Sequence, residues 1–76
     1  MERKNQNGLA EKIGQNITQL REKRRISAVD LAKTLSASEN RILQFEKGLE
    51  RPSPEELLAI SEALNVKVSQ ILEDVE

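Results

Sequence analysis

Apolar residues recur every three or four positions along the chain, which is the spacing of one face of an α-helix. The first series is Leu9, Ile13, Ile17 and Leu20, and it predicts a helix over residues 8–24. The two-residue alternation that is typical of β-strands does not occur. The pattern therefore predicts an all-α protein.

Serine residues suited to helix N-termini divide the rest of the chain into further helices. Ser27 and Ser53 each stand three residues before an acidic residue, the spacing of a capping box, and Ser38 precedes a third helix. The third and fourth helices end before Gly48 and Asn65, which tolerate left-handed backbone. The expected helices cover residues 28–35, 39–47, 54–64 and 68–74, and the expected fold is a compact five-helix bundle.

The length of 76 residues suits a single small domain, which we place at residues 8–76, after a disordered extension over residues 1–7. The longest apolar run, LLAI, is far too short to span a membrane, and the first residues lack the apolar segment of a signal peptide. The chain has no cysteine, so it has no disulfide and no thiolate metal site. These features indicate a cytoplasmic protein.

The composition argues against catalysis. The chain has no histidine, tyrosine or tryptophan, so its serines lack a histidine partner that could activate them as nucleophiles. The commonest metal ligand is absent for the same reason. We therefore expect no enzyme activity, no metal, no cofactor and no small-molecule substrate.

Charge is distributed unevenly along the chain. Residues 21–51 hold eight basic and five acidic groups, whereas residues 52–76 hold one basic and six acidic groups. A basic segment of this kind is typical of a surface that faces a polyanion, although local variation of charge is common in small helical domains. The only aromatic residue, Phe45, is expected in the core, which leaves no platform for stacking single-stranded bases and favours duplex DNA.

The expected helices over residues 28–35 and 39–47 are joined by only three residues, the pattern of a helix-turn-helix. In that motif the second helix enters the DNA major groove, whose width of about 12 Å accepts a helix with its side chains. From Ile13 to Leu72 the chain resembles the Cro/lambda-repressor-like, or XRE-type, family, through the stretches IGQNITQLREKRRIS, LAKTLSAS, ILQFEKG, RPSPEELLAISEALNV and VSQIL. The resemblance implies a sequence-specific double-stranded DNA-binding domain of a bacterial or phage transcription regulator, most often dimeric.

The resemblance also implies which side chains reach base edges. These are Glu39, Asn40 and, one turn later, Gln44, with Arg41 beside them. Asn and Gln can pair with adenine through two hydrogen bonds, and Glu can accept one from cytosine. Two alternatives stay open, because Glu39 also suits the positive end of a helix dipole and Arg41 also suits a phosphate.

Phosphate contacts, by the same resemblance, come from helix starts and from the loop after the third helix. They are Ser27, Ala28, Ser38, Lys47, Arg51 and Ser53. The family's ion pair between the first and third helices corresponds to Arg21 and Glu46.

Three positions depart from the family's pattern. Ala28 stands where Gln is common, Ser36 where the turn commonly has Gly, and Leu43 where a polar residue is usual. A left-handed Ser36 would cost about 1 kcal/mol. Ala28 and Leu43, with the acidic C-terminal segment, motivate an alternative function as a protein-interaction or antitoxin-like module that keeps the fold.

The C-terminal apolar residues exceed what one short helix needs for its own packing. They include Val68, Ile71, Leu72 and Val75. The resemblance implies a two-fold homodimer contact here, and the alternative is that they cover the domain's own core. A dimer would bind palindromic half-sites about 34 Å apart.

Overall fold

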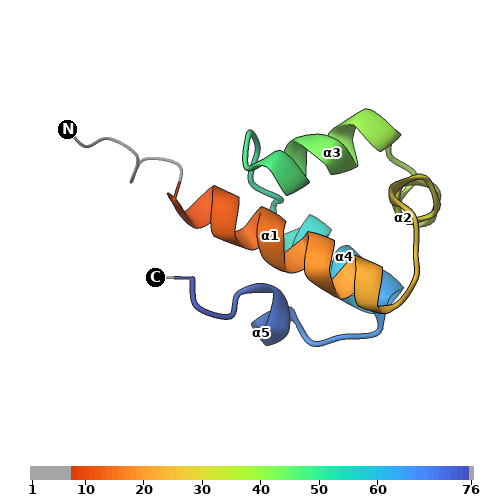
Figure 1. The fold of residues 1–76 in the computed structure, drawn as a ribbon. Helices are drawn as coiled ribbons and strands as arrows, with labels where there is room; N and C mark the ends of the chain where they lie inside the picture. Colours follow the sequence, from red (N-terminus) through yellow and green to blue (C-terminus); the bar gives the residue numbers. More distant parts are fainter. Residues whose placement is uncertain (1–7, 76) are drawn as a thin grey trace.

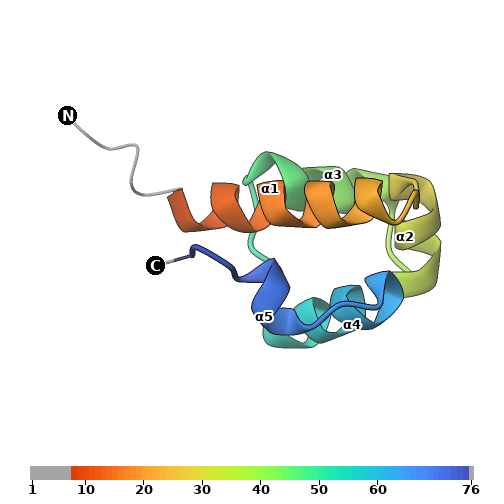
Figure 2. The ribbon, with the colours of Figure 1, turned by 60° about the horizontal axis from the view of Figure 1, so that its bottom comes forward.

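The structure, a computed structural model, describes residues 8–75, so the prediction for residues 1–7 lies outside the described residues. Within that range the chain forms five helices and no strand, which confirms the predicted all-α class. The helices are α1 (Gly8–Lys23), α2 (Ala28–Leu35), α3 (Glu39–Lys47), α4 (Pro54–Leu64) and α5 (Val68–Ile71). Helices α3 and α5 both pack against α1, and α2 lies across one end of the molecule between α3 and α4 (Figures 1 and 2).

The starts of α2, α3 and α4 agree with the sequence because serine side chains set them. The Oγ atoms of Ser27, Ser38 and Ser53 accept hydrogen bonds from backbone N–H groups three residues later, at 3.0, 3.1 and 3.1 Å. Ser53 also donates its own N–H to Oε1 of Glu56 at 2.8 Å, which completes a capping box. At Ser27 the structure shows only the first of these two bonds, because the Asp30 side chain is one methylene shorter than Glu.

The ends of α1 to α4 share one geometry. A residue with left-handed backbone follows each helix, directly after α2, α3 and α4 and two residues after the end of α1: φ is 59° at Arg25, 56° at Ser36, 79° at Gly48 and 57° at Asn65. The next residue returns its N–H to the carbonyl five positions earlier, as in the 2.8 Å bond from Ala37 to Ala32. This is the Schellman motif, in which glycine is usual at the left-handed position. Three of these four helices therefore end on a left-handed residue other than glycine.

The expectation that the fifth helix reaches residue 74 is wrong. The α-helix ends at Ile71, and turns follow up to Asp74, whose φ of 64° is incompatible with a helix. The carbonyls of Ile71 and Glu73 instead accept hydrogen bonds from Nδ2 of the buried Asn16, both at 2.8 Å. These bonds occupy carbonyls at the C-terminal end of the helix and hold the final turns against α1.

The core lies between α1 and the other four helices. Its fully buried side chains are Ile13, Ile17, Leu31, Ile42, Phe45, Ile60, Leu64 and Ile71. The expected core position of Phe45 is confirmed. None of the helices within residues 8–75 has the length and apolar character needed to cross a membrane.

Candidate nucleic-acid interface

The outward side of α3 carries a polar stripe. Residues 40, 44 and 47 follow the four- and three-residue steps that bring side chains to the same side of a helix. Asn40 and Lys47 are exposed and Gln44 is half-buried, whereas Ile42 and Phe45 on the opposite side are fully buried. The burial of one side of α3 therefore fixes which side chains the other side presents.

The remaining side chains of α3 lie on its two flanks. Successive residues turn by about 100° around a helix, which places Glu39 and Leu43 on one flank and Arg41 on the other. Glu39 is exposed and lies in the first turn, and Leu43 is half-buried. The structure thus brings Asn40 and Gln44 together on the outward side, but it separates Arg41 from them.

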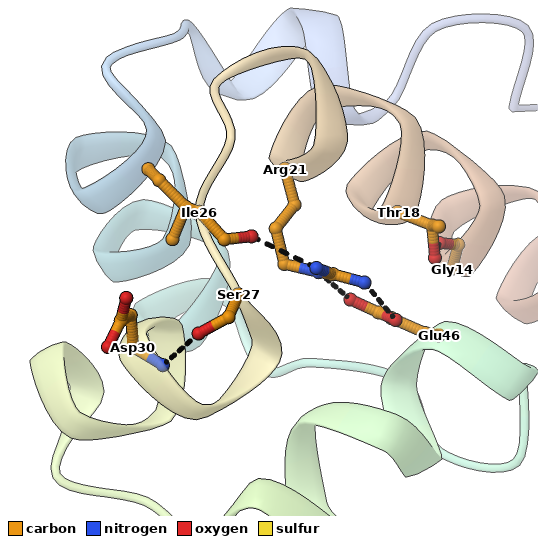
Figure 3. A network of polar contacts seen from close by, with 7 residues as sticks. All are labelled: Gly14, Thr18, Arg21, Ile26, Ser27, Asp30 and Glu46. Carbon is orange, nitrogen blue, oxygen red and sulfur yellow. Dashed lines mark hydrogen bonds and ion pairs between the residues drawn. The ribbon is translucent and has the colours of Figure 1, made fainter.

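One guanidinium group joins α1, the loop before α2, and α3 (Figure 3). Arg21 donates from Nε to Oε2 of Glu46 at 2.6 Å and from Nη2 to Oε1 at 3.1 Å. It also donates from Nη1 to the carbonyl oxygen of Ile26 at 2.9 Å, directly before the N-cap Ser27. The start of α2 is therefore held at a fixed position relative to α3.

Electrostatics and burial favour this arrangement. The hydrogen-bonded Glu46 carboxylate raises the pKa of Arg21 above its ordinary value, although burial acts in the opposite direction. The two side chains are only 14% and 9% exposed, so water competes weakly for their hydrogen bonds. Arg21 therefore stays protonated throughout the neutral pH range.

The backbones of α1 and α3 also approach each other closely, which supports α3 on the side that faces α1. A Cβ atom built on Gly14 of α1 would lie 2.3 Å from the carbonyl oxygen of Phe45 and 2.6 Å from that of Glu46. No side chain fits at such distances, so α1 can pack this closely against α3 only with glycine at position 14. Sequence reasoning did not single out Gly14, although a glycine inside a helical pattern was a usable signal.

The residues expected to contact phosphates occupy helix starts and the loop after α3. Ser27, Ser38 and Ser53 are the exposed N-caps of α2, α3 and α4, where backbone N–H groups and the helix dipole favour anions. Lys47 and Arg51 are also exposed, and Ala28 is half-buried. The surface at these positions thus offers cations, amides and N–H donors.

Within residues 8–75, no group of three or more His, Cys, Asp or Glu side chains could hold a metal ion.

The C-terminal residues expected at a dimer contact need one correction. Ile71 is fully buried in the chain's own core, so it is unavailable to a second subunit. Val68, Leu72 and Val75 are half-buried, and the last two pack against that core. Only the exposed parts of these three side chains can contact a partner.

Comparisons with known proteins agree with this geometry. A family model described as "Helix-turn-helix" matches residues 17–71. Among solved structures, the clp gene regulator ClgR from C. glutamicum is similar, with a TM-score of 0.81 and 25% sequence identity over 84% of this chain and 83% of that chain. No match was found among curated proteins. The chain belongs to the XRE-type helix-turn-helix family of DNA-binding domains.

Proposed function

We propose that this protein is a cytoplasmic transcription regulator that binds double-stranded DNA sequence-specifically, without a cofactor and without catalysis. The observation that carries the proposal is the stripe of Asn40, Gln44 and Lys47 on the outward side of α3. The helix beneath it is fixed to α1 by the Arg21–Glu46 pair. The family match and the similarity to a gene regulator support the same function.

In this proposal α3 lies in the major groove. Asn40 and Gln44 pair with adenine edges, and Glu39 accepts a hydrogen bond from cytosine N4 where its position in the first turn allows. Lys47, Arg51 and the N-terminal ends of the helices after Ser27, Ser38 and Ser53 contact phosphates. Base contacts then select the sequence, whereas phosphate contacts set the position of the protein on the duplex.

Two copies of the domain bind a palindromic operator. The exposed parts of Val68, Leu72 and Val75 supply the contact between them, since these apolar side chains are only half-buried in one chain. Half-sites one helical turn, about 34 Å, apart would place both copies of α3 on the same side of the duplex. Sedimentation of the protein with and without a selected duplex measures this stoichiometry.

Selection of bound duplexes from a random library, followed by titration at several salt concentrations, tests the function. We expect a recurring sequence to emerge, and its affinity to fall steeply as salt rises because bound phosphates release counterions. Lys47→Ala should weaken binding to selected and scrambled duplexes by the same factor. A selected pool in which no sequence is enriched, or an affinity that does not change with salt concentration, would contradict the proposal.

Two exposed leucines favour a second candidate, a protein-interaction module. Leu49 and Leu58 are 65% and 53% exposed, and the segment from residue 52 onward is acidic. Stoichiometric capture of one protein partner, with loss of capture in Leu58→Ser and no duplex selected from the library, would establish this alternative in place of DNA binding.

A further inference from the structure

Arg41 lies in a cluster of charged groups on the flank of α3 that faces α4. Its Nη2 donates to Oε2 of Glu56 at 2.8 Å, and its Nε lies 3.5 Å from Oε1 of Glu50. Its guanidinium carbon lies 5.2 Å from the centre of the Phe45 ring. One cation is thus held by two carboxylates and one aromatic face.

The carboxylate of Glu56 is positioned independently of Arg41. Its other oxygen, Oε1, accepts the N–H of Ser53 at 2.8 Å as part of the capping box of α4. An ordinary surface ion pair loses much of its strength through the cost of ordering two flexible side chains. Here one partner is already ordered, so the pair holds Arg41 more firmly than its partial exposure would suggest.

The location of the cluster matters for DNA binding. Arg41 is displaced around α3 by about 100° from Asn40 and by about 60° from Gln44. It therefore borders the outward stripe without belonging to it. An arginine released at this border could reach a phosphate, because guanidinium groups bind phosphate oxygens as readily as carboxylates.

We propose that Glu50 and Glu56 hold Arg41 away from the DNA backbone, so that Arg41 is not a phosphate contact. The inference rests on the proposed function. Contacts to phosphates strengthen binding to every DNA sequence, whereas discrimination depends on the difference in affinity between the operator and other DNA. By neutralising a cation at the edge of the interface, the two carboxylates lower the affinity for unselected duplexes.

The test compares four forms of the whole chain: unaltered, Arg41→Ala, Glu50→Gln with Glu56→Gln, and all three substitutions together. Glutamine also closes a capping box, so α4 keeps its N-terminal hydrogen bonds. Binding to a selected operator and to a scrambled duplex is followed by fluorescence anisotropy at several salt concentrations. The slope of the logarithm of affinity against the logarithm of salt counts phosphate contacts, with about 0.9 for each. Thermal melting of each form verifies that it is folded.

We expect Arg41→Ala alone to leave the slope unchanged. Glu50→Gln with Glu56→Gln should steepen it by about 0.9 and tighten binding to the scrambled duplex several-fold, and the added Arg41→Ala should remove the change in slope. A lower slope in Arg41→Ala alone would overturn the inference, because Arg41 would already contact a phosphate. A steeper slope that survives the triple substitution would also overturn it, because relief of carboxylate repulsion alone would explain the gain. If the unaltered protein binds no duplex, the proposed function itself fails, which is a separate result.

Discussion

Replacing Ser36 with glycine should stabilise the protein. Ser36 ends α2 with φ 56° and ψ 40°, and its N–H is bonded within the Schellman motif that closes the helix. Left-handed backbone costs a residue with a Cβ atom about 1–2 kcal/mol, and glycine avoids this cost. Glycine also gains about 0.5–1 kcal/mol of conformational freedom in the unfolded chain, which acts in the opposite direction.

Taking the middle of each range, the net gain is about 0.75 kcal/mol in the free energy of unfolding. This raises Tm by about 3–6 °C for a domain of this size. The side chain is exposed, so its removal leaves no cavity. Urea and thermal denaturation followed by circular dichroism measure both quantities.

Ser36→Ala is the matched control for this prediction. It removes the hydroxyl but keeps the Cβ atom, so it retains the left-handed strain and should be no more stable than the unaltered chain. If Ser36→Gly proved as stable as Ser36→Ala or less stable, the strain argument would be refuted.

Three further predictions concern the support of α3. Gly14→Ala should lower the free energy of unfolding by about 2 kcal/mol in urea denaturation, because the added Cβ would lie 2.3 Å from a backbone oxygen of α3. Gly8→Ala is the control: a Cβ at position 8 meets nothing within 4 Å, so this substitution should change the free energy of unfolding little. Glu46→Ala should lower the free energy of unfolding by about 2–4 kcal/mol in the same assay, because it leaves the mostly buried guanidinium of Arg21 without its carboxylate partner. A loss below about 1 kcal/mol, which is typical of surface pairs, would show that solvent screens the pair. The pKa of Arg21 is raised in the folded protein. The stability linked to that shift is therefore fully present at any pH below the pKa of Arg21 in the unfolded chain. It is lost only as pH rises through the higher pKa that Arg21 has in the folded protein. The deficit of Arg21→Ala should therefore stay constant from about pH 6 to 9, and a deficit that varies across this range would contradict the assignment.

Local signals were sufficient to predict most of the helix boundaries. The bounds of α2, α3 and α4 match the residues expected from Ser27, Ser38 and Ser53 at their starts and from left-handed residues at their ends. A capping serine bonds to backbone only three residues away, so the information lies within one turn of sequence. Prediction from sequence works where the deciding interaction is this short.

Contacts between distant residues account for what sequence reasoning missed. Apolar spacing predicts too long a fifth helix, because it does not distinguish a helix from turns that keep the same residues inward. The turns are hydrogen-bonded to Asn16, which is 55 residues away from Ile71 in the chain. The pairing of Arg41 with Glu56 spans 15 residues and two helices, and no local pattern marks it. The expected DNA contacts of Glu39, Asn40 and Gln44 remain predictions.

Base readout by the outward side of α3 is tested most directly by the sequence preference of Asn40→Ala. The protein and this variant are titrated against the selected operator and against operators in which each base pair is replaced in turn. We predict that Asn40→Ala loses about 1–3 kcal/mol on the operator, becomes indifferent to the identity of one base pair, and binds scrambled DNA as before. An Asn40→Ala protein that keeps the full base preference of the unaltered chain would contradict the account.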